Sequence, residues 1–430
     1  MTSAFESTTT AVNGFRRRLG ISGVILRVAL IIGLGELGFA TVLPLLPLYL
    51  TEQLGASASI VGLVIASFAL VETVGKTLWG SVADRIGRRP MIVAGLLLSS
   101  LAPLLMSVLR VPLLFVPLRL IDGGGSAALW PAASAIIADK SPLERRATAM
   151  GALNMFFLAG LALGPELGLY VSGLTGSHAA GFYVASGLLA SAGLLAFVML
   201  RGVGKGRPSP TEGSVLDYGG IGPILHLGEL VEGLRTSPQL VMMLMVAFVQ
   251  ALGLGLLAPI IIIYMKHTVG LPEGLIGSLI LLLVLAIALT QVPGGVVADR
   301  WGKANAVSLG MLIGSVGMWL LPLSPRLEVF SFAALLLGAS YALSVPAWHA
   351  LVSELAPPGR IGLAMGAAQT AEGLGIVFGS LLGGALWDTL GQRAPFVASA
   401  VLFSIATAVL LIALRRTRAV STGQRRPRRG

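Results

Sequence analysis

Long apolar runs restrict the fold of this 430-residue chain more than any motif does. Apolar residues make up 55% of the sequence and charged residues only 11%, whereas soluble domains carry about 25% charged residues. A helix needs about 20 apolar residues to cross the roughly 30 Å hydrocarbon core of a bilayer. We therefore predict an all-α membrane protein with twelve transmembrane helices, at 24–50, 59–80, 91–109, 112–138, 147–172, 180–200, 239–263, 274–298, 305–323, 327–353, 362–387 and 394–414.

The second half of the sequence repeats the first at a fixed offset. Residues 80–85 read GSVADR and residues 295–300 read GVVADR, an offset of 295 − 80 = 215. Glycine and proline mark positions where the backbone is special, so their recurrence at one offset indicates two copies of one backbone. Each copy has an even number of spans, which predicts two parallel six-helix repeats about an axis normal to the membrane. The same offset, without a gap, pairs Pro44 with Pro259, Gly123 with Gly338, Pro131 with Pro346, Gly151 with Gly366 and Gly164 with Gly379.

Basic residues predict the orientation. With the N-terminus in the cytoplasm, 23 Lys and Arg residues fall on that side and four on the other, which is a strong positive-inside bias. We expect an integral protein of the plasma (inner) membrane with both termini cytoplasmic. The net charge of +11 then reflects contact with anionic lipid, and no nucleic-acid partner is expected. The predicted parts are a tail at 1–20, an N-terminal bundle at 21–201, a linker at 202–238, a C-terminal bundle at 239–414 and a basic tail at 415–430.

Two features of the sequence argue against enzyme chemistry. The chain has no cysteine, which excludes disulfides and thiolate metal sites. The predicted linker offers only His226, Glu229 and Glu232 for chemistry in water, which is too little for a nucleophilic or metal centre. We expect no enzyme, no metal site and no bound cofactor.

The repeated charged segment resembles a known family. The pattern Gly80-x-x-x-Asp84-Arg85-x-Gly87-Arg88-Arg89, with a weaker copy around Asp299 and Arg300, resembles the motif between helices 2 and 3 of the major facilitator superfamily. The resemblance covers essentially the full chain. It implies alternating access, in which Asp84 and its arginines form a cytoplasmic latch against the other half. The alternative is a positive-inside turn with no gating role.

Two further stretches resemble the twelve-span bacterial drug:proton antiporters. Leu37-Gly38 followed by Pro44-x-x-Pro47 is similar to their helix 1, and residues 160–168 are similar to their helix-5 signature, carried here by Gly160, Gly164, Pro165 and Gly168. The resemblance implies a monomer that exports small lipophilic substrates, cationic or neutral, and uses the proton gradient as its energy source. Ordinary packing of small residues is the alternative for the helix-5 stretch. A lipid or lysolipid flippase and a metabolite importer of the same fold stay open.

Ionisable residues inside the predicted spans are costly and mark functional hypotheses. Arg119 and Asp122 are three apart and share a helix face, in a stretch that resembles the family's proton-coupling arginine motif. Glu72 and Lys76 are four residues, or one helical turn, apart, and this spacing predicts a structural ion pair. The proton-coupling candidates are Glu36, Arg119, Asp122 and Glu166, and the substrate-cavity candidates are Glu36, Phe39, Trp130, Phe156, Phe157, Glu372 and Phe378.

Glu36 is the predicted principal proton carrier. It lies in the middle of its span with no basic residue within two helical turns, so burial favours its neutral, protonated form. We expect the neighbouring glycines Gly33, Gly35 and Gly38 to leave room for a ligand beside it. The repeat-related residue is Ala251, so the role would belong to one half only.

Overall fold

The computed structural model describes residues 22–142, 145–203, 238–323, 325–356 and 361–423, and within them every regular element is helical. The predicted tail at 1–20, nearly all of the predicted linker and the end of the basic tail lie outside the described residues. The first half contains α2 (Gly23–Leu48) with its π-helical extension (Tyr49–Gln53), α3 (Ala58–Ile86), α4 (Arg88–Val108), a 3-10 turn (Pro112–Leu114), α5 (Phe115–Lys140), α6 (Arg146–Thr175) and α7 (His178–Met199). The second half contains α10 (Pro238–Leu257), α11 (Ile261–His267), α12 (Glu273–Trp301), α13 (Lys303–Leu320), α14 (Leu327–Leu355), α15 (Ile361–Leu390) and α16 (Ala394–Gly423).

Eleven of the described helical segments are long and apolar enough to cross a membrane. The predicted span that is missing from these eleven is 305–323, which corresponds to α13; this helix has 18 residues and begins with Lys303, and Asn305 follows two residues later. At 1.5 Å per residue, 18 residues rise about 27 Å, close to the thickness of the hydrocarbon core. The polar start of α13 therefore explains why it falls outside the eleven, and the twelve-helix arrangement is confirmed.

The packing of the helices repeats between the halves, as predicted. In the first half α2 packs on α6 and α7, and in the second α10 packs on α15 and α16. Likewise, α3 packs on α5 and α12 packs on α14. Positive-φ glycines recur at the same offset, where the chain needs a conformation that other residues rarely adopt. These pairs are Gly55 with Gly270, Gly87 with Gly302, and Gly176 with Gly391.

Most predicted bounds differ from the structure by a few residues, and two of the predicted helices differ more. The span predicted at 239–263 is interrupted at Ala258–Ile260, because Pro259 cannot donate a backbone hydrogen bond, and the chain turns there through short-range bonds such as Ile260 N–H to Leu257 O at 3.0 Å. Pro44, at the equivalent position, lies inside a continuous α2. The last helix continues to Gly423 instead of ending at 414.

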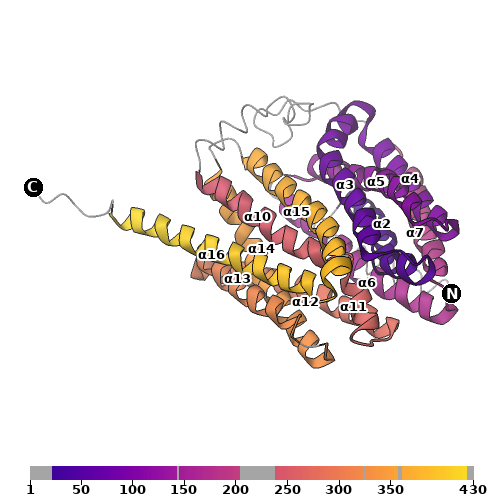
Figure 1. Ribbon diagram of the computed structural model, residues 1–430. Coiled ribbons are helices and arrows are strands. Elements are labelled where there is room, and N and C mark those ends of the chain that lie inside the picture. The colour runs from indigo at the N-terminus through magenta and orange to yellow at the C-terminus, as the bar shows by residue number, and fades with distance from the viewer. Residues whose placement is uncertain (1–21, 143–144, 204–237, 324, 357–360, 424–430) are drawn as a thin grey trace, which may run out of the picture.

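The two halves meet through two crossed helix pairs. Figure 1 shows the indigo-to-magenta helices of the first half on one side and the rose, orange and yellow helices of the second half on the other. α3 packs on α15, and α12 packs on α6. The contact between α3 and α15 is close, because a Cβ added to Gly62 would lie 2.2 Å from the Ser380 carbonyl oxygen. These pairs place the predicted cavity helices of both halves around one interface.

Candidate functional site

Glu36 lies on α2 and is partly buried. Among the described residues, none donates a hydrogen bond to its carboxylate or forms an ion pair with it, and its electrostatic neighbours are Glu72 and Lys76 of α3. Most ionisable groups in a protein interior are paired. The carboxylate of Glu36 is therefore available to a proton or to a cationic ligand.

The glycines around Glu36 serve helix packing. A Cβ on Gly33 would lie 2.9 Å from the Phe156 carbonyl oxygen, and one on Gly35 would lie 2.7 Å from the Leu96 side chain. A Cβ on Gly38 would meet Leu189 at 2.7 Å. The expectation that these glycines leave room for a ligand is wrong, because side chains or backbone of α4, α6 and α7 already occupy the space beside them.

The helix-5 glycines lie directly against the stretch of α2 that carries Glu36. A Cβ on Gly160 would lie 2.4 Å from the Gly33 carbonyl oxygen and 3.0 Å from the Glu36 Cβ. Gly164 approaches Leu37, Ala40 and Thr41 in the same way, and Gly168 approaches Thr41. The second half repeats this arrangement, with Gly375, Gly379 and Gly383 against α10. Because both halves use these glycines for close packing, the glycines alone do not distinguish a coupling motif, and that role stays a prediction.

We expect Gly164→Ala to destabilise the protein and to reduce transport. The new methyl group would lie 2.5 Å from the Ala40 Cβ and 2.8 Å from the Leu37 carbonyl oxygen, so α2 and α6 must separate, at a typical cost of about 1–3 kcal/mol. Gly173→Ala on the same helix is the matched control, because nothing lies within 4 Å of its Cβ position. Equal thermal stability of the two variants in detergent would contradict this prediction.

The predicted pair of Glu72 and Lys76 is present, at 3.0 Å one turn apart on α3. A second pair is more deeply buried. Arg119 Nη1 donates to Asp122 Oδ2 at 2.6 Å, and both side chains are at most 5% exposed. The guanidinium of Arg119 also stacks over the Phe68 ring at 4.0 Å. Both predicted pairs therefore form, whereas the role of Arg119 and Asp122 in proton coupling stays a prediction.

Glu166 and Glu372 lie on the helices that join the halves. Glu166 of α6 accepts a hydrogen bond from Ser278 of α12 at 3.3 Å, across the interface, while its other carboxylate oxygen is buried without a partner. Glu372 lies on α15, with electrostatic contacts to Lys76 and to Tyr341. Lys76 of the first half thus interacts with an acid from each half, Glu36 and Glu372.

The predicted aromatic residues fall into two groups. Trp130 and Phe157 meet edge to face at 5.2 Å, and Phe39 and Phe156 pack against the same core of the first half. Phe378 lies on α15 of the second half and contacts Phe248 of α10 at 6.3 Å.

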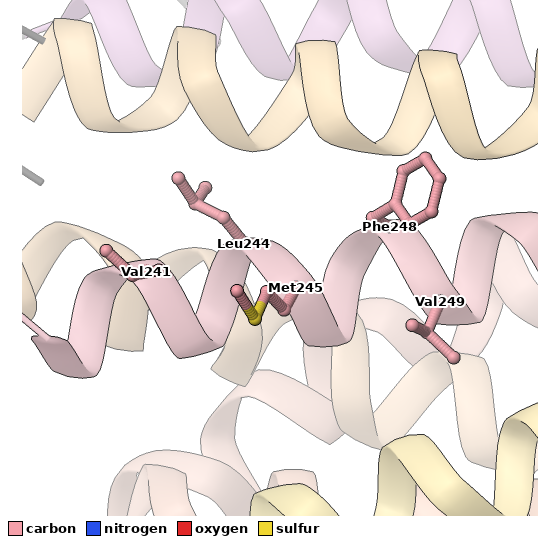
Figure 2. Close-up of a pocket in the computed structure, with 5 residues that line it drawn as sticks. All are labelled: Val241, Leu244, Met245, Phe248 and Val249. Carbon is pink, nitrogen blue, oxygen red and sulfur yellow. The ribbon is translucent and has the colours of Figure 1, made fainter. Parts of the chain in front are cut away.

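A hollow of about 400 Å³ lies along α10, lined by Val241, Leu244, Met245, Phe248 and Val249. Figure 2 shows that all five side chains come from this one helix and that Leu244 and Phe248 point to the same side of it. One helix cannot enclose a ligand, and none of the predicted cavity residues lines the hollow. Its link to the predicted cavity is the contact of Phe248 with Phe378.

The charged motif between α3 and α4 binds its own half. Gly87 has φ 101° and connects the two helices. Arg88 forms an ion pair with Asp139 and donates to the Ala135 carbonyl oxygen at 2.8 Å, and Arg89 donates to the Phe197 carbonyl oxygen at 2.6 Å. At the equivalent positions, Lys303 pairs with Glu354. The side chains of Asp84 and Arg85 lie outside the described residues, Asp299 and Arg300 are exposed, and the latch stays a prediction.

The opposite ends of the bundles carry polar contacts between the halves that the sequence analysis did not single out. The carboxylate of Asp388, at the end of α15, accepts hydrogen bonds from the backbone N–H groups of Ala58 and Ser59 at 3.2 and 2.8 Å and from the Ser59 hydroxyl at 2.6 Å. It caps the first turn of α3, which belongs to the other half. Lys266 reaches Glu52 of the other half at 2.7 Å. The available signal was the acidic residues near the predicted outer helix ends, Glu52, Glu273 and Asp388.

Comparison with known proteins places the chain in a family. A sequence model described as Major Facilitator Superfamily matches residues 28–246 and 243–430. The chain is 29% identical over 385 residues to Multidrug resistance protein MdtG of Salmonella paratyphi C (strain RKS4594), covering 85% of this chain and 89% of that protein. It is 23% identical over 364 residues to Multidrug resistance protein 2 of Bacillus subtilis (strain 168), covering 84% and 88%.

Solved structures show the same fold. The inward-facing, unoccupied crystal structure of a bacterial homologue of the human lysosomal transporter Spinster matches with a TM-score of 0.75 at 17% identity, over 91% of this chain and 96% of that one. The nucleoside transporter NupG matches with a TM-score of 0.70 at 12% identity, over 92% and 99%. The family model, the relatives that match over most of the chain and the fold agree, and the chain belongs to the Major Facilitator Superfamily of membrane transporters.

Proposed function

We propose that this transporter exports small lipophilic compounds, cationic or neutral, in exchange for protons. The observation that carries the proposal is the Glu36 carboxylate, which has no hydrogen bond or ion pair among the described residues and lies in the middle of α2. The names of the full-length relatives, which are multidrug resistance proteins, support export of such compounds. A carboxylate that binds either a proton or a cation makes the two compete, which is the simplest form of antiport.

The contacts between the halves support alternating access. Polar contacts such as Asp388 to α3 and Lys266 to Glu52 lie at the ends predicted to face outward. At the other end, Arg88 and Lys303 pair within their own halves. This arrangement fits a state that is closed outside, and rocking of the two bundles would open it. We further propose that the protein resides in the inner membrane, with both termini in the cytoplasm.

The proton gradient is the proposed energy source, with no bound cofactor. Each pH unit supplies about 1.4 kcal/mol per proton, and each 100 mV supplies about 2.3 kcal/mol per charge moved. One or two protons therefore suffice for concentration ratios of tens to thousands. We propose that a monomer carries out the whole cycle, because both halves of the site lie in one chain.

Proteoliposomes that contain a pH-sensitive dye test this function. We expect addition of tetraphenylphosphonium, a lipophilic cation, to cause proton movement that depends on the protein, and an imposed pH gradient to drive its transport. Movement of a fluorescent lysolipid without any response to the cation would instead indicate a lipid flippase. Downhill uptake of nucleosides or other metabolites, with no proton movement on addition of the cation and no gradient-driven transport of it, would indicate an importer. The flippase result and the importer result would each reject the proposal.

We expect Asp388→Ala to shift the protein toward a state that is open outside. The change removes three hydrogen bonds to the start of α3, and loss of a helix cap costs about 0.5–2 kcal/mol. Ser59→Ala, which removes only one of these bonds, should have a smaller effect. Spin labels on Val111→Cys and Leu323→Cys, one on each half, would report the distance between the outer ends of the two halves. If Asp388→Ala left the distribution of this distance unchanged, the cap would not be a contact that keeps the outer end closed.

A further inference from the structure

Three arginines from different elements of the first half meet at the last turn of α7. Arg27 lies near the start of α2, Arg89 lies near the start of α4, and Arg201 follows the end of α7 by two residues. We call Arg27, Arg89 and Arg201 the arginine cluster. All three lie at the end of the first half that the positive-inside bias predicts to face the cytoplasm.

The cluster is built around Phe197, in the last turn of α7. Arg89 Nη2 donates to the Phe197 carbonyl oxygen at 2.6 Å, and Arg27 Nη1 donates to the Met199 carbonyl oxygen at 2.8 Å. The guanidinium groups of Arg89 and Arg201 both stack on the Phe197 ring, with their central carbons 5.0 and 5.4 Å from its centre. One aromatic ring and one helix end therefore hold three cations together.

The contacts leave the cluster with a surplus of positive charge. The last carbonyl groups of a helix together carry about half a negative charge, against three full positive charges. The neighbouring Arg88 has an acid partner in Asp139, whereas within the described part of the chain no carboxylate pairs with Arg27, Arg89 or Arg201. The Nε atom of Arg89 is also buried without an acceptor. A guanidinium has five N–H donors, so the cluster can bind a further anion.

An exposed apolar surface adjoins the cluster. Leu194, Phe197 and Val198 of α7 are 62%, 46% and 53% exposed, and Leu97 and Leu101 of α4 are exposed as well. Figure 1 places α4 and α7 on the side of the first half that is away from the second half. In a membrane this surface therefore contacts lipid chains.

We propose that the arginine cluster, held around Phe197, binds the phosphate group of an anionic phospholipid whose acyl chains lie along α4 and α7. The guanidinium fork matches phosphate oxygens in both geometry and charge. Basic pockets between transmembrane helices on the cytoplasmic side are suited to anionic headgroups, because that leaflet carries the negative surface potential. A lipid uses both the surplus charge and the apolar surface, whereas a free anion uses only the charge.

Capping of α7 alone does not account for the cluster. It explains the hydrogen bonds of Arg27 and Arg89 to the last carbonyl groups. It does not explain a further cation, Arg201, stacked on the same ring as Arg89. Every residue of the cluster belongs to the first half, so the lipid site is expected to persist while the two halves rock. The proposal therefore does not depend on the proposed export of drugs.

Titration of the purified protein in detergent with phosphatidylglycerol tests the proposal. Thermal stability gives the apparent affinity, and native mass spectrometry counts the bound lipid. We expect phosphatidylglycerol to bind and to raise the thermal stability. Phosphatidylcholine with the same acyl chains, and inorganic phosphate at the same concentration, should do neither. Equal effects of phosphatidylcholine or of inorganic phosphate, or no effect of phosphatidylglycerol, would overturn the proposal.

Three variants separate a specific site from general surface charge. Arg201→Gln removes one charge but none of the hydrogen bonds to the end of α7, and we expect it to weaken the apparent affinity about five-fold. Phe197→Leu keeps every charge but removes the ring that holds two guanidinium groups, and it should also weaken binding. Arg145→Gln is the matched control, because Arg145 is exposed at the start of α6, at the same end of the bundle. Unchanged affinity in Arg201→Gln or in Phe197→Leu, or equal weakening in Arg145→Gln, would overturn the proposal.

Discussion

Glu36→Gln is expected to abolish transport driven by a pH gradient while leaving the protein folded. Glutamine has nearly the same shape, but it can neither bind nor release a proton near neutral pH. No hydrogen bond or ion pair among the described residues depends on the Glu36 charge, so its loss should not disturb the packing of α2. The measurement is uptake of a lipophilic cation into proteoliposomes with an imposed pH gradient, together with thermal stability in detergent.

Substrate binding supplies the second readout for Glu36. In the wild type, a cationic substrate competes with a proton at this carboxylate, so binding should weaken as the pH falls. Glu36→Gln should bind the cation more weakly and with no such pH dependence. Glu328→Gln, at an exposed glutamate in the first turn of α14, is the matched control. If Glu36→Gln kept both gradient-driven transport and wild-type pH dependence of binding, Glu36 would not be the proton carrier.

The sequence predicted the helices well because lipid leaves the backbone few choices. Backbone polar groups must be satisfied internally in a bilayer, so each long apolar run becomes a helix. The 215-residue offset also predicted helix pairs that were later found equivalent, down to the matching φ of Gly87 and Gly302. The residues around each proline did not predict whether that proline would interrupt its helix. Pro44 lies inside a continuous helix, whereas Pro259, at the equivalent position, interrupts one.

The candidate site was less predictable, because it depends on which helices meet. The glycines beside Glu36 indicated a close approach, but sequence alone could not say whether a ligand or a helix approaches. Asp388 caps α3 through Ser59 and Ala58, which are separated from it in the sequence by 329 and 330 positions. The pair of Arg119 and Asp122 was predictable because both residues lie on one face of one helix. Contacts within a helix can thus be derived from spacing, whereas contacts between the halves require the fold.

Arg119→Ala is expected to have the largest effect on stability. It would leave Asp122 buried without its cationic partner, and breaking a buried pair in this way costs about 3–5 kcal/mol. It would also remove the stacking of the guanidinium on Phe68. We expect lower thermal stability in detergent and impaired gradient-driven transport.

The double variant Arg119→Leu with Asp122→Leu separates folding from coupling. Arg119 Nε and Asp122 Oδ1 are both buried without a partner, so the pair does not satisfy its own polar groups. Replacing such a pair with apolar side chains is often neutral or stabilising, and we expect the double variant to recover most of the stability that Arg119→Ala loses. If the pair contributes to coupling, the recovered protein should still fail to move protons with the substrate. A stable double variant with normal proton-coupled transport would show that the pair is structural, and the coupling role would then fall to Glu36 and Glu166.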